Sequence, residues 1–392
     1  MQHQKHVIMI GGCLEQFEQY QYYPDLTVSV LANGNDLKDA IKAGLNCYEA
    51  DPKNYRQCLD IIVTNQLSVN LYAIFSFIEY GLETAAYLGE ALGVLCNPLK
   101  PVIHTRNKHL MRLTLSQTCP EISIPYLIPS SKQQIQAFLE THQKIIIKPI
   151  DGAGSMGVQA ITALNELADI DDNLSNLVCE KYIGGKEYSV ESQSAQGLHQ
   201  IVAITEKYTT EHAPYVELSH IVPARLTPAE QSLIEQTVHT FLQAIGQVHG
   251  PAHTEIKLYN GQAYIIESQT RLGGDRIWKL CELATGHNFI RSFVEQVLFK
   301  KIYNVDTQHK TAAIKFFAPQ PGKLQKISIP KELEHTEGVV DIHIARKVGD
   351  NIPPLASSLD RTGFAILSAK NYQALDQLMQ NMDTIHLETS HN

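Results

Sequence analysis

Residues 253–275 read HTEIKLYNGQAYIIESQTRLGGD, and this stretch decides the fold class more than any other part of the chain. Two apolar runs flank Asn260-Gly261, a dipeptide typical of a tight β-hairpin turn. Glu255 and Glu267 interrupt these runs and are an even number of residues apart. A plain two-residue turn would place them on opposite faces of the hairpin. We therefore predict a three- or five-residue connection, or a bulge, that brings the two carboxylates opposite each other.

The second strand of this hairpin carries further polar side chains on the face of Glu267. Gln269 and Arg271 follow at two-residue intervals, and alternate residues of a strand share a face. Two carboxylates, an amide oxygen and a guanidinium suit Mg²⁺ that bridges ATP phosphates, with Arg271 beside developing negative charge. Gly273-Gly274 then allows close approach of a substrate. The alternative is a solvated hairpin face with a Glu–Arg ion pair.

A glycine-rich loop lies upstream, where residues 145–158 read IIIKPIDGAGSMGV. Three of its glycines have the spacing GxGxxG: Gly152, Gly154 and Gly157. Val158 follows the last glycine, which excludes a Walker A loop, and the chain lacks the HRD and DFG motifs of protein kinases. A dinucleotide site would need a helix after the loop, whereas residues 158–162 read as a strand.

The remaining arrangement is a strand carrying Lys148, a flexible Gly/Ser loop and a returning strand. Glycines let backbone N–H groups approach phosphate oxygens, and Lys148 adds a compact positive charge. This pattern indicates a phosphate-binding loop. The alternative is an ordinary glycine-rich hairpin with an exposed lysine.

The N-terminal part of the chain alternates between predicted strands and helices. The strands are expected at 6–10, 26–31 and 69–77, and the helices near 36–43, 54–65 and 82–92. Such alternation predicts a parallel, doubly wound sheet. Gly11-Gly12 ends the first strand without the GxGxxG spacing, which disfavours a nicotinamide oxidoreductase.

Further helices are predicted downstream, at 108–118, 131–141, 227–247 and 372–382. Thr227 and Glu230 form a capping box at the start of the third of these helices. The region from 314 onward otherwise reads as short strands and turns.

Composition limits the class of protein. A chain of 392 residues with 44% hydrophobic residues predicts two or three globular domains. The formal net charge is −9 and no basic cluster stands out, so we expect no nucleic acid partner. Seven cysteines lie far apart without a CxxC pair, as in a reduced cytoplasm, and no apolar run is long enough for a signal peptide or a membrane span. We expect a cytoplasmic protein with no membrane partner.

Taken together, these motifs resemble the ATP-grasp superfamily. The resemblance rests on Lys108, Lys148 with its glycine loop, CEKYIGGKEYSVE at 179–191 and the hairpin at 253–275, in that order. It implies an α/β protein with an N-terminal doubly wound, Rossmann-like βα domain, a small α+β lid domain and an α+β C-terminal domain. The implied boundaries are 1–105 for the first domain, 106–300 for the ATP-grasp domain with a lid at about 147–207, and 301–392 for the C-terminal subdomain.

The resemblance also implies roles for individual residues. Lys108 and Lys148 would contact ATP phosphates or adenine. Glu255 and Glu267 would bridge two Mg²⁺ ions, with Mn²⁺ as a substitute. The remaining implied ATP ligands are Gly154, Ser155 and Gly157 over the triphosphate, Glu180, Lys181 and Ile183 at the adenine, and Glu187 at the ribose.

Within this superfamily the chain is most similar to L-amino acid ligases, which make dipeptides. The similarity lies in VELSHIVPA at 216–224, ESQTRLGGD and RKVGDNIPPLASSLDRTGFAIL at 346–367. It implies that Glu217 binds a substrate amino group and that His220 lies near the reacting carboxylate, although a structural histidine is the alternative. Gln269 departs from the Asn usual in the family, which affects its assignment as a metal ligand. The loop at 11–25 also departs from the common pattern.

The predicted reaction is amide formation from a small carboxylate and an amine, driven by ATP through an acyl phosphate. Arg271 and His220 are the predicted catalytic residues, and Gly273 and Gly274 complete the substrate site with Glu217. Two alternatives remain: a carboxylate ligase of nucleotide or cofactor metabolism, and an ATP-binding protein without catalysis. A homodimer is expected by analogy.

Overall fold

The computed structural model describes residues 4–152, 157–210, 215–305 and 309–390. Its N-terminal part is a four-stranded parallel sheet of order β3-β2-β1-β4. The strands are β1 (Lys5–Ile10), β2 (Leu26–Ala32), β3 (Asn46–Glu49) and β4 (Leu71–Phe75). The helices are α1 (Leu14–Phe17), α2 (Gly34–Lys42), α3 (Tyr55–Thr64), α4 (Leu82–Ala91) and α5 (Leu99–Arg106).

Side chains of β1 alternate between two cores, which explains why this sheet is covered on both faces. Ile8 packs with residues of α3 and α4, whereas Val7 packs with α2 and with helices from later in the chain. A strand that is buried on both faces reads as a continuous apolar run, as β1 does. The doubly wound prediction is therefore confirmed.

A large antiparallel sheet of eight strands forms the centre of the molecule, with the order β13-β12-β9-β10-β11-β14-β18-β16. Its strands are β9 (Lys186–Ala195), β10 (Leu198–Thr209), β11 (Glu217–Val222), β12 (Gly250–Tyr259), β13 (Gln262–Gln269), β14 (Thr311–Phe317), β16 (Val339–Ile344) and β18 (Gly363–Ala369). Its helices are α6 (Lys108–Thr118), α8 (Pro228–Ile245), α9 (Ile277–Thr285), α10 (Phe289–Phe293) and α11 (Tyr372–Asn381). The strands of the predicted C-terminal part thus continue the central sheet.

The helices α6 and α8 share one core with β9, β10, β12 and β13. The helices α9 and α10 lie in the core that also contains Val7, so they connect the central sheet to the N-terminal sheet. The predicted start of α8 is confirmed, because Thr227 and Glu230 form a capping box there.

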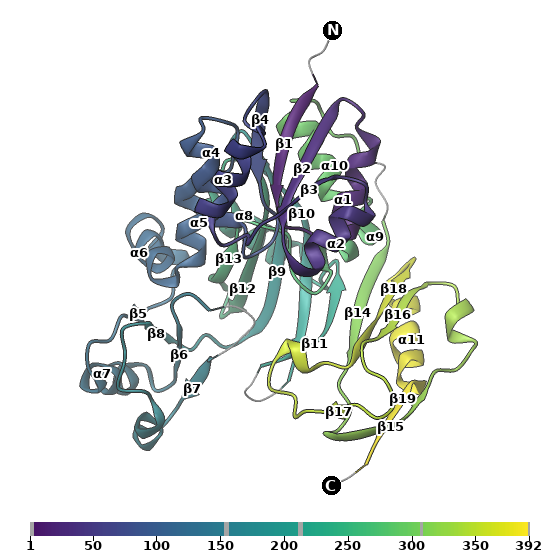
Figure 1. The fold of residues 1–392 in the computed structure, drawn as a ribbon. Helices are drawn as coiled ribbons and strands as arrows, with labels where there is room; N and C mark the ends of the chain where they lie inside the picture. The colour runs from purple at the N-terminus through teal and green to yellow at the C-terminus, as the bar shows by residue number, and fades with distance from the viewer. Residues whose placement is uncertain (1–3, 153–156, 211–214, 306–308, 391–392) are drawn as a thin grey trace.

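A smaller antiparallel sheet of order β5-β8-β6-β7 projects from one side of the central sheet (Figure 1). It consists of β5 (Tyr126–Leu127), β6 (Ile145–Pro149), β7 (Gln159–Ile161) and β8 (Leu177–Lys181), with α7 (Lys132–His142) packed on it. The strands β9 and β10 belong to the central sheet. The predicted lid at 147–207 therefore does not coincide with the small sheet, which begins earlier and ends earlier.

The C-terminal part adds a three-stranded sheet of order β17-β15-β19 on the other side of the molecule (Figure 1). It comprises β15 (Gly322–Ser328), β17 (Asn351–Ile352) and β19 (His386–Thr389). The short helical turns are η1 (Glu18–Tyr22), η2 (Pro120–Ile122), η3 (Leu164–Asp169), η4 (Val294–Leu298), η5 (Leu333–His335), η6 (Ser358–Asp360) and η7 (Met382–Thr384). No helix in the described ranges is long and apolar enough to cross a membrane.

Candidate active site

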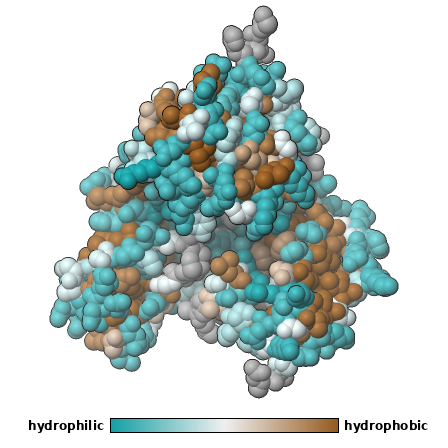
Figure 2. All heavy atoms as spheres, viewed as in Figure 1, coloured by the Kyte–Doolittle hydropathy of each residue, from teal (hydrophilic) through white to brown (hydrophobic). Residues whose placement is uncertain are grey.

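A cavity of about 640 Å³ lies between the small sheet, the central sheet and the C-terminal part. In the view of Figure 2 the surface is hollowed where these parts meet. Most of the side chains singled out from the sequence line this cavity: Lys108, Lys148, Glu180, Lys181, Ile183, Glu187, Glu217, His220, Glu255, Glu267, Gln269, Arg271 and Gly274. The structure therefore gathers residues from separate motifs into one space.

The hairpin of β12 and β13 places Glu255 directly opposite Glu267. Its turn is nevertheless the tight one, with Tyr259 paired to Gln262. A register shift next to Glu255 compensates, because one extra residue is accommodated in β13. The bulge that the sequence pattern required is thus confirmed, and it turns both carboxylates toward the cavity.

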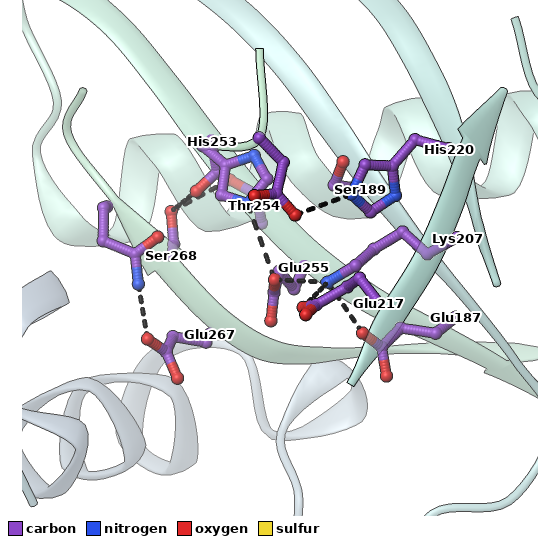
Figure 3. A network of polar contacts seen from close by, with 12 residues as sticks. Glu187, Ser189, Lys207, Glu217, His220, His253, Thr254, Glu255, Glu267 and Ser268 are labelled. Carbon is purple, nitrogen blue, oxygen red and sulfur yellow. Dashed lines mark hydrogen bonds and ion pairs between the residues drawn. The ribbon is translucent and has the colours of Figure 1, made fainter. Parts of the chain in front are cut away.

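Three basic groups surround this pair of carboxylates, and Figure 3 shows two of them, Lys207 and His253. The Lys207 ammonium lies 2.6 Å from Glu255, and the His253 imidazole lies 3.5 Å from it. Lys108 lies 3.3 Å from Glu267. Burial by itself would raise the pKa of Glu255, but Lys207 and His253 hold it well below its usual value. Glu255 is therefore an anion in the folded protein.

Lys207, which the sequence analysis missed, joins three of the predicted site residues. Its ammonium lies 2.9 Å from Glu187 and 3.6 Å from Glu217, in addition to Glu255 (Figure 3). Burial would lower the pKa of this lysine, but the three carboxylates raise it well above its usual value. A buried charge persists only when it is paired. Lys207 therefore acts as a fixed counter-ion at the centre of the cavity.

His253 is a second site residue that the sequence analysis missed, and Glu191 fixes its orientation. Its Nδ1 lies 2.6 Å from the buried Glu191, which also accepts a hydrogen bond from Ser189. Burial opposes protonation of this histidine, but Glu191 and Glu255 raise its pKa to about 9. The signal was present in the sequence, because His253 precedes Glu255 by two residues and shares its face of β12.

Lys148, one of the two lysines predicted to contact ATP, lies in β6 and lines the cavity. Lys148 lies 2.8 Å from Glu180, whose other oxygen accepts from Arg112 at 2.7 Å. Burial would raise the pKa of Glu180, but Arg112 and Lys148 lower it to about 2. Arg112 also donates to the carbonyl groups of Ile265 and Ile266 at the bulge, so it links Glu180 of the small sheet to the hairpin.

The glycine loop follows Lys148 at the end of β6. Gly154 and Ser155, both predicted to cover ATP, lie outside the described residues. Gly157 is described and has φ of 73°, a conformation that glycine adopts readily. The chain then returns as β7, as predicted. The Lys108 ammonium donates to the carbonyl of Gly152 at 2.7 Å, which ties α6 to this loop.

At the predicted adenine position, the N–H of Lys181 donates to the carbonyl of Pro125 at 2.9 Å. This N–H is therefore already used within the protein. Lys181 and Ile183 both line the cavity, so they remain next to the space that the sequence assigned to adenine.

Arg271 lies on the cavity wall, and its side chain is held by the N-terminal part of the chain. Its Nε lies 2.5 Å from Glu79, and Arg106 binds the other oxygen of that carboxylate. Glu79 was not singled out from the sequence, because nothing local shows that the loop after β4 reaches Arg271.

Glu217 and His220 lie on β11 at the other end of the cavity. His220 is almost fully buried, and its Nε2 lies 3.1 Å from Asp275, which also binds Arg361. Gly273 lies against a different pair, because a Cβ atom there would lie 2.8 Å from Glu191 and 2.9 Å from the His253 ring. At Gly274 a Cβ atom would meet nothing within 4 Å.

The oxygen donors at the hairpin fit a hard divalent cation. Glu255 and Glu267 supply carboxylate oxygens, and Gln269 contacts Glu267 through its Nε2 at 2.5 Å. In the described ranges no group of three His, Cys, Asp or Glu side chains could hold a metal. The two glutamates therefore fit a cation that takes its remaining ligands from elsewhere, as Mg²⁺ does from water and substrate phosphates.

Comparisons with known proteins agree with this geometry. Residues 141–279 match the model of the ATP-grasp domain, and residues 315–390 match that of the L-amino acid ligase C-terminal domain 2. The fold is similar to that of an L-amino acid ligase from Bacillus licheniformis, with a TM-score of 0.80, 21% identity and 99% of each chain covered. The chain is an ATP-grasp ligase.

Two further proteins are similar to this ligase over most of its length. Dapdiamide A synthase of Enterobacter agglomerans is 22% identical over 357 residues, covering 85% of this chain and 83% of that protein. A phosphoribosylglycinamide synthetase from Anaerococcus prevotii has a TM-score of 0.77 and 14% identity, with 98% of this chain and 100% of that chain covered. The resemblance to ATP-grasp and L-amino acid ligases that the sequence motifs indicated is confirmed.

Proposed function

We propose that this ligase uses ATP and Mg²⁺ to join two L-amino acids into a dipeptide, with release of ADP and phosphate. One observation carries the proposal. A single cavity contains two lysines at one end, two facing glutamates in the middle, and Glu217 with His220 at the other end. This order matches the order of a nucleotide, a metal and an amino acid along a phosphoryl-transfer path.

The nucleotide would lie between the small sheet and the hairpin. Lys108 and Lys148 would neutralise its phosphates, and the glycine loop would cover them. Glu180 would contribute to the adenine site mainly by holding Lys148 in position, because its carboxylate is already bound to Lys148 and Arg112. Glu187 would reach the ribose while it remains paired with Lys207.

Glu255 and Glu267 would hold Mg²⁺, with Gln269 as a further oxygen donor. The ion would neutralise phosphate charge while the substrate carboxylate attacks the γ-phosphorus. Two ions, or Mn²⁺ in place of Mg²⁺, are part of this proposal. Arg271, fixed by Glu79, would stabilise the charge on the transferred phosphoryl group.

The first amino acid would bind with its ammonium at Glu217 and its carboxylate near His220. The amine of the second amino acid would then attack the acyl phosphate, displacing phosphate and forming the amide. Exclusion of water protects such an intermediate, and the small sheet is placed to close over the cavity. The division into units at 1–105, 106–300 and 301–392, and a homodimer, remain proposals.

Turnover with a panel of amino acids tests this function. Purified protein with Mg²⁺-ATP and pairs of L-amino acids should release phosphate, and mass spectrometry should show a dipeptide in an amount equal to the ADP. ADP formation that requires another carboxylate instead would favour the ligase of nucleotide or cofactor metabolism, for which the phosphoribosylglycinamide synthetase fold is the supporting observation.

Glu267→Gln tests the metal assignment within the same assay. Loss of one carboxylate from the pair should lower kcat by about a hundredfold or more, since even partners behind a metal ligand are worth about 10- to 100-fold. Glu235→Gln, a change on α8 at a half-buried residue that does not line the cavity, is the control and should keep normal turnover. Normal Mg²⁺-dependent ADP formation by Glu267→Gln would contradict the assignment.

A further inference from the structure

A segment of the C-terminal part, residues 353–361, reaches the cavity from outside the ATP-grasp domain. It connects β17 to β18 and contains η6. Ser358, at the start of η6, lines the cavity and donates a hydrogen bond to Oε2 of Glu217 at 2.7 Å. One oxygen of the carboxylate that we assign to the substrate ammonium is therefore fixed by this segment.

Arg361 ends the segment and fixes a second group. Its two terminal nitrogens bind the two oxygens of Asp275 at 2.8 and 2.5 Å, the bidentate geometry in which a guanidinium orients a carboxylate most strongly. The guanidinium lies over the Phe316 ring at 3.6 Å from its centroid. The His220 ring meets the same Phe316 edge-on, at a centroid distance of 5.8 Å. Arg361 and His220 are thus held by one aromatic ring and one carboxylate.

The orientation of His220 follows from these contacts. Asp275 is an acceptor, so the hydrogen bond at Nε2 places the proton of that nitrogen toward Asp275. Burial would raise the pKa of Asp275, but the hydrogen bonds from Arg361 and His220 keep it low, so the acceptor stays charged. The other ring nitrogen, Nδ1, is buried and has no hydrogen-bond partner among the described residues. His220 itself lines the cavity, so Asp275 holds its ring in one orientation at the cavity wall.

We propose that Ser358 and Arg361, in the segment 353–361, shape the pocket for the amino acid that is activated. In this arrangement Ser358 and Arg361 are positioning residues for Glu217 and His220. The inference rests on the proposed function and adds that recognition of this substrate depends on the C-terminal part, while nucleotide and metal binding do not. It names the substrate as an α-amino acid whose ammonium approaches Oε1 of Glu217, the oxygen that Ser358 does not bind and that lies 3.6 Å from Lys207.

Four variants test the pocket: Ser358→Ala, Ser358→Thr, Arg361→Lys and Ser357→Ala. Ser357→Ala is the matched control, because its hydroxyl bonds Asp360 within the segment, whereas that of Ser358 bonds Glu217. For each variant we would measure the KM of both amino acids and of ATP, and the Kd of Mg²⁺-ATP by calorimetry without amino acids. Thermal unfolding of each variant shows whether the fold is intact.

Ser358→Ala should raise the KM of the activated amino acid about tenfold, the value of one hydrogen bond to a charged group. Its Kd for Mg²⁺-ATP should equal that of the wild type. Ser358→Thr keeps the hydroxyl, so its KM for the activated amino acid should equal that of the wild type. Arg361→Lys should lower kcat/KM for the same amino acid, since a lysine cannot bind Asp275 through two nitrogens.

Three outcomes would overturn the inference. In the first, Ser358→Ala has the KM values of Ser357→Ala. In the second, the KM values for the amino acid and for ATP rise together, as in a general distortion. In the third, the wild type forms no ADP with any amino acid, which contradicts the proposed function as well. The first two occur with an active wild-type ligase, so failure of the inference alone is distinguishable.

Discussion

At the scale of single residues, the site depends on charges that balance one another in a buried space. Lys207 has a side chain that is only 3% exposed and lies among three glutamates. Taking charges out of water is costly, and their mutual attraction offsets that cost only when all partners are present. Lys207 is therefore as important for the stability of the folded protein as the carboxylates that would take part in the reaction.

Lys207→Met should destabilise the protein. The substitution leaves Glu187, Glu217 and Glu255 without their shared cation, and breaking a buried ion pair lowers the free energy of unfolding by about 3 to 5 kcal/mol. Added Mg²⁺ should recover part of this loss, because it supplies positive charge at Glu255. Urea unfolding with and without Mg²⁺ measures both effects.

The control for this change is Lys326→Met, because Lys326 forms an ion pair whose side chains are 61% and 56% exposed. Its free energy of unfolding should change by less than about 1 kcal/mol. Equal stability of the two variants would contradict the role of Lys207.

A buried histidine predicts a pH dependence. His287 packs against Phe289 and Tyr303, and burial lowers its pKa to about 4. The unfolded chain takes up a proton below pH 6.5, whereas the folded protein does not. Stability should therefore fall as the pH decreases from 6.5 to 4, and His287 should account for up to about 3 kcal/mol of that loss.

His287→Phe should remove this contribution. We would compare urea unfolding of the variant and the wild type at pH 7 and at pH 4.5. The wild type should lose more stability between these values than the variant does. A parallel decrease in both proteins would show that other groups cause the acid sensitivity.

At the scale of elements, the turn after β13 packs closely against β9 and β12. Gly273 approaches the Glu191–His253 pair so closely that a methyl group would displace it. His253 of that pair also lies 3.5 Å from Glu255, so the effect should reach the metal site that we propose. Gly274, one residue further, faces open space.

Gly273→Ala should therefore lower the free energy of unfolding by about 1 to 3 kcal/mol, the usual effect of overpacking. Gly274→Ala should stay within about 0.5 kcal/mol of the wild type. Thermal unfolding of the two variants measures this difference directly. Equal thermal stability of the two variants would contradict the crowding at Gly273.

At the scale of the whole molecule, the N-terminal sheet contributes to a site that lies mostly in the central sheet. Glu79 follows β4 and binds both Arg271 and Arg106. This contact and the core shared by β1, α9 and α10 connect the two sheets. The orientation of Arg271 therefore depends on how the N-terminal part docks.

Glu79→Gln should lower kcat by about tenfold to a hundredfold, because a displaced guanidinium no longer meets the transferred phosphoryl group. Binding of Mg²⁺-ATP, measured by calorimetry, should stay close to that of the wild type. Glu83→Gln is the control, because Glu83 binds Arg106 and has no contact with Arg271. Equal activity of the two variants would contradict the assignment.

The sequence by itself determined the elements whose cause is local. Apolar periodicity and caps predicted β1, β2, α6 and α8. The two-residue period of β12 and β13 predicted either a longer connection or a bulge, and the structure has the bulge. The order of the motifs along the chain indicated the ligase family. These features depend on neighbours within a few residues, so they can be read without the fold.

The tertiary structure alone decided which distant side chains meet. Lys207, His253 and Arg361 lie 48, 62 and 86 residues from Glu255, Glu191 and Asp275 respectively, and no local pattern pairs them. Long-range contacts depend on sheet order and on the docking of separate parts, which a single sequence does not specify. The chemistry of each group was visible in the sequence, but the charge balance of the site arises only where β9, β10, β11 and β12 lie side by side and the C-terminal segment reaches them.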